Sequence, residues 1–376
     1  AAPAAPGPTN HDPIIIGSVG TYSGPAGGTL VKLPEGLQVW VKWINDRGGV
    51  NGHPVKLSVV DDGADSARYR SAVQDLVENK KAVALLAGGA PFTGKSMVEY
   101  LTQKRVPMIG EEGGSDWFYD SPVYFPIGAT GKTFLGPAIA TGLAKLMLPQ
   151  GKKKWGSIAC AEAEACAAAD QVWHDGGEME KAGLEPVYRA RASLAQPDYT
   201  AECLAARNAG AEIVTTVMDD TAVSRIAASC GRQNYRPVFN PVGPAAHAKY
   251  KDDPNLLGGV MTIATFPWLK NDTPATAEFN AAMKKYFTAQ AQPGHAYGWA
   301  SGKVLEKAVA ATTQPTTSAG ILQGLWTFRN ETLGGLTMPL TWVQDQLSPR
   351  QPCWSAVIVG KGTFEMVEGG RVQCKD

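Results

Sequence analysis

The sequence carries no excess charge of either sign, because its 35 Lys and Arg residues are balanced by 35 Asp and Glu residues. Proteins that bind nucleic acid need surplus cations for the phosphates, so we expect no nucleic-acid partner. No apolar run approaches the roughly 18–20 residues of a membrane-spanning helix. The 376 residues, 44% hydrophobic and 19% charged, are typical of a globular chain long enough for two α/β domains.

Motifs that carry catalysis or bind metals are also missing. The sequence has no G-x-S-x-G elbow, no H-E-x-x-H, and no G-x-G-x-x-G after its first predicted strand. Its five histidines include no pair at metal-ligand spacing, and its cysteines form no C-x-x-C pair. We therefore predict a protein that is not an enzyme, with no catalytic residues, no metal and no other cofactor.

Six cysteines are present, an even number: Cys160, Cys166, Cys203, Cys230, Cys353 and Cys374. Local proximity favours three sequential disulfides, Cys160–Cys166, Cys203–Cys230 and Cys353–Cys374. Sequence alone allows fifteen pairings, and six buried reduced thiols are the alternative. We favour disulfides, which persist mainly in oxidising compartments, and hence expect an exported protein.

Short apolar stretches alternate with amphipathic ones in two parts of the chain. In the first part, strands are predicted at 13–20, 56–62, 82–87 and 107–110, with helices at 35–45, 66–79 and 94–104 between them. The alternation restarts at Trp155, with strands near 155–160, 184–188, 212–218 and 237–239. Strand–helix alternation predicts a parallel sheet covered on both faces, and the restart predicts a second lobe of the same type.

The later segments suggest that the chain crosses between the lobes three times, near residues 127, 260 and 340. The first lobe would comprise residues 13–127 and 261–339, and the second residues 128–260 and 340–376. Strands are expected at 340–343, 354–359 and 363–367. Residues 1–12 begin with an Ala- and Pro-rich stretch that predicts a flexible tether, either a processed terminus or a linker below a lipid anchor.

Three segments resemble a known family. Ile16-Gly-Ser-Val-Gly-Thr-Tyr-Ser-Gly-Pro25 is similar to the opening strand and loop of the branched-chain (Leu/Ile/Val) amino-acid binding proteins. Ile44-Asn-Asp-Arg-Gly-Gly-Val-Asn-Gly-His-Pro-Val-Lys56 is similar to the family's turn after its first helix, and Val59-Val-Asp-Asp62 to its second strand. The resemblance implies the type I periplasmic binding protein fold: two doubly wound α/β lobes with parallel sheets, joined by a hinge of three crossovers.

The resemblance also implies a function. It predicts the periplasmic or otherwise extracytoplasmic substrate-binding component of an ABC importer, which closes on a small organic solute and delivers it to the permease. Nothing in the sequence requires oligomerisation, so we expect a monomer. A ligand-sensing receptor domain of the same fold is an alternative.

Family ligand sites lie in loops at the strand ends, and carrying these over gives ten candidate ligand-binding residues. From the first lobe they are Thr29, Pro91, Phe92, Thr93, Gly113 and Ser115, and from the second Glu164, Asp219, Asp220 and Val242. The family's acidic residue, which grips an α-ammonium, falls on or beside Val242, and its tyrosine near Ala165. Both departures argue against an ordinary α-amino acid as the ligand. Glu111 and Glu112 bring further carboxylates to the cleft and favour a ligand with amine or hydroxyl donors.

One motif supports a different class of protein. Gly89-Ala-Pro-Phe-Thr-Gly-Lys-Ser96 satisfies the P-loop pattern G-x-x-x-x-G-K-[ST] after a predicted strand. In a nucleotide-binding protein Lys95 would contact phosphates and Ser96 would bind magnesium. Because Pro91 removes one N–H donor from such a loop, we keep nucleotide binding as the alternative rather than the main prediction.

Overall fold

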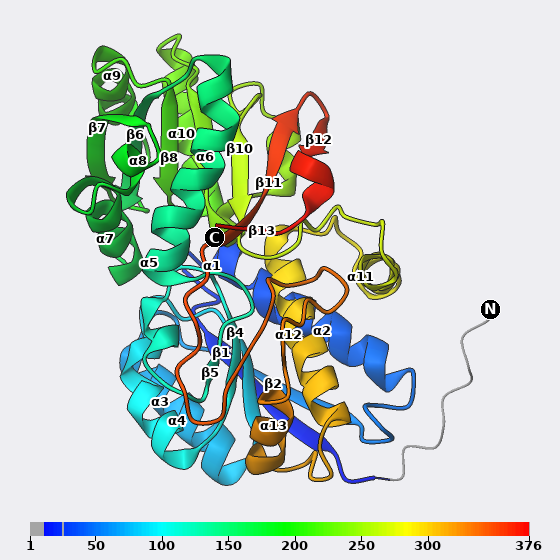
Figure 1. The fold of residues 1–376 in the computed structure, drawn as a ribbon. Coiled ribbons are helices and arrows are strands. Elements are labelled where there is room, and N and C mark those ends of the chain that lie inside the picture. The colour runs from blue at the N-terminus through cyan, green and yellow to red at the C-terminus, as the bar shows by residue number, and fades with distance from the viewer. Residues whose placement is uncertain (1–10, 25, 376) are drawn as a thin grey trace.

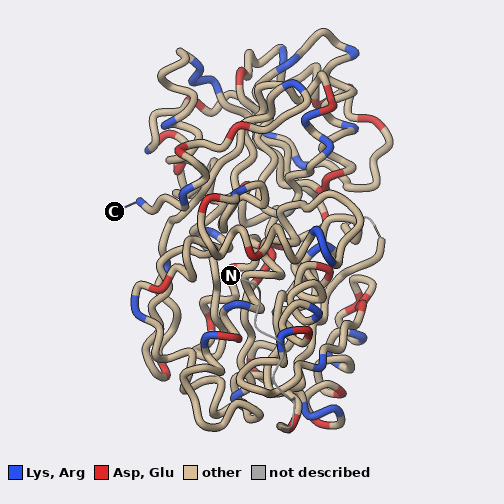
Figure 2. Tube along the Cα trace, turned by 90° about the vertical axis from the view of Figure 1, so that its right-hand side faces the viewer, with Lys and Arg blue, Asp and Glu red and all other residues tan. Residues whose placement is uncertain are grey.

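A computed structural model of the protein describes residues 11–24 and 26–375, so most of the predicted tether lies outside the described residues. Two lobes lie one above the other in Figure 1. Acidic and basic residues are interspersed over both lobes (Figure 2). Within the described residues, no helix combines the length and the apolar character needed to cross a membrane.

The first lobe is built on a parallel sheet with strand order β2-β1-β3-β4-β5. Its strands are β1 (Ile14–Gly20), β2 (Val55–Asp61), β3 (Ala84–Gly88), β4 (Met108–Glu111) and β5 (Tyr124–Phe125). Every residue of β3 and β4 is buried, as expected for strands covered on both faces. The helices are α1 (Gly27–Leu30), α2 (Lys32–Asn45), α3 (Ser66–Gln74), α4 (Val98–Lys104), α11 (Pro274–Tyr286), α12 (Pro293–Ala310) and α13 (Ser318–Leu325).

The second lobe contains a parallel sheet with strand order β7-β6-β8-β9. Its strands are β6 (Lys154–Cys160), β7 (Glu185–Ala192), β8 (Ile213–Val217) and β9 (Val238–Pro241). Its helices are α5 (Gly131–Thr133), α6 (Ile139–Met147), α7 (Glu164–Asp170), α8 (Glu178–Lys181), α9 (Thr200–Asn208) and α10 (Asp220–Arg232). An antiparallel sheet follows, made of β10 (Val260–Ile263), β11 (Cys353–Gly360), β12 (Thr363–Met366) and β13 (Gln373–Cys374). A bridge between Val242 and Thr262 connects the two sheets.

The crossings between the lobes differ in place from those expected at 260 and 340. Strand β10 pairs with β11, so residues 261–263 belong to the sheet of the second lobe, and the chain returns to the first lobe after Ile263. Residues 340–350 stay on the first lobe: the Trp342 ring lies 5.0 Å from that of Phe125, and Ser348 Oγ donates to the Tyr124 carbonyl at 2.9 Å. The last crossing therefore lies between Arg350 and Cys353.

The prediction of a strand at 340–343 was wrong. Leu340 forms only an isolated bridge with Glu331. Trp342 is buried between Phe125 and Phe328, whose ring centroids lie 5.0 and 4.9 Å from its own. The apolar residues of this segment anchor it to the first lobe through their side chains, which a strand-like pattern does not distinguish from backbone pairing.

The six cysteines form the three sequential disulfides that local proximity favoured. Cys160–Cys166 joins the end of β6 to α7, and Cys203–Cys230 joins α9 to α10. Cys353–Cys374 joins the paired strands β11 and β13. All three lie in the second lobe.

Helices α2 and α12 approach each other along a stripe of glycines. Gly294, Gly298 and Gly302 recur every four residues along α12, and a Cβ atom built on Gly298 would lie 1.9 Å from the Leu33 carbonyl oxygen of α2. The absence of side chains at this spacing lets the two backbones come into contact. This helix pair packs against β3 of the first-lobe sheet and positions the N-terminal end of α2 beside the second lobe (Figure 1).

Candidate ligand-binding site between the lobes

A cavity of about 100 Å³ lies between the lobes, at the carboxyl ends of strands from both sheets. In doubly wound α/β proteins this edge of the sheet is where ligands bind. The first lobe contributes α1 and the loops after β3 and β4. The second contributes α7, the segment after α5 and the loops after β6, β7, β8 and β9. The lining residues used below are Thr29, Leu30, Pro91, Phe92, Glu112, Gly113, Phe134, Leu135, Cys160, Cys166, Leu194, Val217, Met218, Asp219 and Val242.

Six of the ten predicted site residues line this cavity: Thr29, Pro91, Phe92, Gly113, Asp219 and Val242. Ser115 and Glu164 line a neighbouring cavity instead, together with Pro91 and Lys95. Thr93 and Asp220 line neither cavity.

The side chain of Thr93 holds two loops of the first lobe together. Its hydroxyl donates to Asp62 Oδ2 at 2.6 Å, and the Thr21 hydroxyl donates to Asp62 Oδ1 at 2.8 Å. Asp62 is fully buried. Thr93 therefore fixes the loop after β3 against the end of β2 instead of lining the cavity that its position in the family predicts.

The residues of the P-loop pattern are engaged in other contacts. Lys95 Nζ lies 2.9 Å from Glu164 Oε1 in the second lobe, and this bond raises the pKa of Lys95. The Ser96 hydroxyl donates to the Thr93 carbonyl at 2.7 Å. Lys95 thus bridges the lobes at the exposed rim of the cleft.

Several residues that line the cavity were not predicted as site residues from the sequence. Phe134 and Leu135 come from a segment for which no strand-end loop was predicted, Leu194 lies just beyond β7, and the Cys160–Cys166 disulfide forms part of the wall. Glu112 was recognised only as one of two adjacent acidic residues. The structure separates these two, because Glu111 accepts hydrogen bonds from the Ile127 and Gly128 N–H groups at the first crossover.

Two carboxylates of the cavity, Glu112 from the first lobe and Asp219 from the second, are each only partly hydrogen-bonded. Glu112 Oε1 accepts from Ser115 Oγ at 2.5 Å, and Asp219 Oδ1 caps α10 by accepting from the Thr221 N–H at 2.9 Å. Glu112 Oε2 and Asp219 Oδ2 are buried and have no hydrogen-bond partner among the described residues. Burial raises the pKa of Glu112, against the lowering effect of the hydrogen bond from Ser115.

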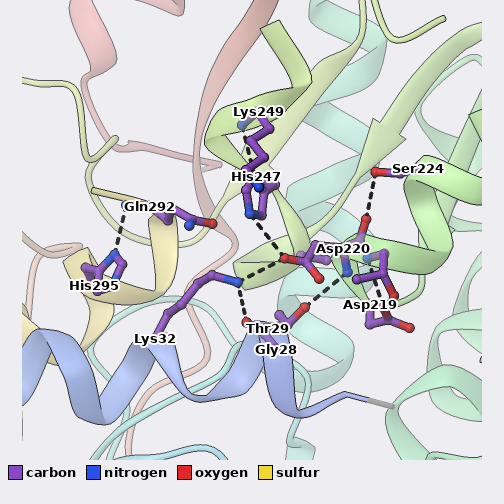
Figure 3. A network of polar contacts seen from close by, with 12 residues as sticks. Gly28, Thr29, Lys32, Asp219, Asp220, Ser224, His247, Lys249, Gln292 and His295 are labelled. Atoms are coloured by element: carbon purple, nitrogen blue, oxygen red, sulfur yellow. Dashed lines mark hydrogen bonds and ion pairs between the residues drawn. The ribbon is translucent and has the colours of Figure 1, made fainter. Parts of the chain in front are cut away.

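Beside the cavity, a buried polar network joins the lobes (Figure 3). Lys32 Nζ, on α2, lies 2.9 Å from Asp220 Oδ2, on α10, with side-chain exposures of 9% and 7%. The Asp220 N–H donates to Thr29 Oγ1 at 3.1 Å, and His247 Nε2 lies 3.5 Å from Asp220 Oδ2. Asp220, Lys32 and Thr29 therefore hold the lobes together in this conformation.

A family model for periplasmic binding proteins matches residues 13–363. The chain belongs to the periplasmic binding protein family. This family implies an extracytoplasmic location, and its fold is that of substrate-binding proteins, which are typically non-enzymatic. A comparison with curated protein sequences gives no match.

Solved structures share the fold of this periplasmic binding protein at low sequence identity. A leucine-binding protein from Thermotoga maritima has a TM-score of 0.77 and 14% identity, covering 94% of this chain and 97% of its own. A fatty acid ABC transporter substrate-binding protein from Thermomonospora curvata has a TM-score of 0.79 and 17% identity, covering 99% and 95%. An ABC transporter solute-binding protein from R. palustris, in complex with benzoate, has a TM-score of 0.76 and 14% identity, covering 97% and 98%. The predicted type I fold is confirmed.

The interlobe network makes the stability of this periplasmic binding protein depend on pH. Burial, aided by the Lys32 and Lys249 cations and opposed by Asp220, lowers the pKa of His247 from 6.5 to about 4. Between those values the unfolded chain binds a proton that the folded protein does not, so stability falls as the pH drops through this window. We expect a loss on the order of 2–3 kcal/mol between pH 7 and pH 4 from His247.

The measurement is the free energy of unfolding against pH for the wild type and for His247→Asn, which retains a side-chain acceptor for the Lys249 N–H. Glu111 and Glu112, whose pKa values are raised by burial, act in the opposite direction, so only the difference between the two proteins reports on His247. Parallel curves for the two proteins would contradict the prediction.

Proposed function

We propose that the protein is the extracytoplasmic substrate-binding component of an ABC importer, and that it binds a small organic solute between its lobes by hinge closure. The observation that carries this proposal is the cavity that both lobes line at the carboxyl ends of their strands. A solute there contacts both lobes only when they are closed, so it binds the closed state more tightly and shifts the population toward it.

In this proposal the closed protein, acting as a monomer, presents both lobes to an ABC permease. It is located in the periplasm or outside the cytoplasm, either free or held by a lipid anchor. The family and the ABC substrate-binding proteins among its structural neighbours support this placement.

The lining of the cavity argues against an ordinary α-amino acid as the solute. Where the amino-acid binders have the acidic residue for the α-ammonium, this chain has the buried, apolar Val242. In addition, none of the cavity-lining residues among those described is Lys, Arg or His, so an α-carboxylate would have no counter-ion there. A zwitterion would therefore have its carboxylate in the cavity without a counter-ion among the described lining residues.

The test is native mass spectrometry of the protein as purified, repeated after denaturation and with added ATP and magnesium. We expect a small organic mass that is present on the native protein and released on unfolding. Stoichiometric binding of ATP that depends on magnesium and is lost in Lys95→Ala, without any co-purified solute, would favour the nucleotide-binding alternative and contradict the proposal.

A further inference from the structure

We infer that the solute is a small amine without a carboxylate, whose ammonium group lies between Glu112 of the first lobe and Asp219 of the second. This inference rests on the proposed function and goes beyond it by assigning a chemical class to the ligand. It follows from three features of the described residues: two unpartnered carboxylate oxygens, the absence of cations from the cavity lining, and apolar walls.

Two carboxylates of the cavity each have a buried oxygen without a hydrogen-bond partner among the described residues. Glu112 and Asp219 are each 95% buried, since their exposures are 5%, and both line the cavity. One oxygen of each accepts hydrogen bonds from its own loop, whereas Glu112 Oε2 and Asp219 Oδ2 have no partner in the part of the chain that the structure describes. Leaving a buried acceptor unpaired is unfavourable, more so for a charged group. An ammonium group carries the N–H donors that both oxygens lack.

The charges around the cavity select a cation over an anion. The nearby cations are already paired: Lys32 with Asp220, and Lys95 with Glu164 at the rim. Neither lysine lines the cavity. A ligand carboxylate would therefore meet two acidic side chains with no cation to offset them, which is unfavourable at short range in a site of low dielectric.

Apart from Thr29 and the glycine residues, the remaining walls are apolar. They include the rings of Phe92 and Phe134, the side chains of Leu30, Leu135, Leu194, Val217, Met218 and Val242, and the Cys160–Cys166 disulfide. The volume of about 100 Å³ is smaller than that of an engineered cavity of about 150 Å³ that holds benzene. A compact alkyl amine with about five non-hydrogen atoms fits this space, with its apolar part against these walls.

The two carboxylates also couple binding to closure. Glu112 follows β4 in the first lobe, and Asp219 follows β8 in the second. An ammonium group satisfies both oxygens only when the lobes are together, so its second hydrogen bond stabilises the closed state alone.

The experiment is isothermal titration of n-butylamine, n-butyrate and leucine into protein freed of co-purified solute by unfolding and refolding with its disulfides intact. We expect n-butylamine to bind and n-butyrate and leucine not to bind. Glu112→Gln and Asp219→Asn should each weaken n-butylamine at least about tenfold, because each removes a charge-assisted hydrogen bond. Asn at 219 is a good N-cap, so α10 should keep its start.

Glu212→Gln is the matched control. Glu212 also accepts backbone hydrogen bonds, from the Lys153 and Lys154 N–H groups, but lies at the opposite end of β6 from the cavity. The Glu212→Gln variant should bind n-butylamine with the same affinity as the wild type.

The outcomes separate this inference from the proposed function. Tighter binding of n-butyrate or leucine, a co-purified solute without an amine, or n-butylamine binding that is equal in all three variants would overturn the inference while a binding protein still stands. The absence of any co-purified solute together with no binding of the three probes would overturn both.

Discussion

Gly298→Ala is expected to destabilise the protein by about 3 kcal/mol or more, at the upper end of the range for overpacked cores. The new Cβ would lie 1.9 Å from the Leu33 carbonyl oxygen and 2.7 Å from the Leu37 nitrogen. Both contacts are with the backbone of α2, so no side-chain rotation can relieve them. Helices α2 and α12 must move apart, which also displaces Lys32 at the interlobe contact.

The measurement is the free energy of unfolding from denaturant titration. Gly28→Ala is the control, since the nearest atom to its new Cβ is Asp220 Oδ1 at 3.9 Å. We expect that variant to lie within about 0.5 kcal/mol of the wild type. Equal stability of the two variants would show that the α2–α12 contact is looser than described.

Lys32→Met is expected to raise the ratio of open to closed protein by about a hundredfold or more. Removing one partner of a buried ion pair costs about 3–5 kcal/mol, because the other charge stays buried and uncompensated. Among the described residues, Asp220 Oδ2 would keep only His247, whose Nε2 lies 3.5 Å away. Asp220 Oδ1 has no hydrogen-bond partner among them. Opening the lobes returns Asp220 to water and relieves this cost.

Lys95→Met provides a matched control for closure. Lys95–Glu164 joins the same two lobes at the same 2.9 Å distance as Lys32–Asp220, but its side chains are 61% and 64% exposed. Exposed pairs contribute less than about 1 kcal/mol, so this variant should behave as the wild type. Small-angle scattering of the ligand-free proteins and titration with the co-purified solute measure the effect. Indistinguishable scattering and affinity for the two variants would argue against a buried latch.

Local sequence patterns predicted most of the elements of both parallel sheets. The apolar stretch at 13–20 is strand β1, and the segments at 66–79 and 94–104 are helical, although part of each is not regular α-helix. These predictions depend only on periodicity and on turn residues, both of which act over a few positions. The same reasoning was wrong at 340–343, where Trp342 packs between the ring of Phe125, far away in the sequence, and that of Phe328.

The residues of the site were harder to predict from the sequence, because contacts with the other lobe determine which side chains line the cavity. Position in the strand-end loops indicated Thr29, Phe92 and Asp219, which line the cavity. It also indicated Thr93, whose hydroxyl instead bonds to Asp62. A candidate loop can be found from its place after a strand, but the direction of a side chain depends on which buried acceptor lies near it.

Short-range patterns were enough to predict the two-lobed α/β architecture and the family resemblance, and local proximity favoured the sequential pairing of the cysteines that the structure contains. The different roles of adjacent acidic residues became visible in the folded protein: Glu111 supports the crossover while Glu112 lines the cavity, and Asp220 joins the lobes while Asp219 lines the cavity. The physical reason is the same in both pairs. Adjacent residues at a strand or helix end point in different directions, and their surroundings come from segments distant in the chain.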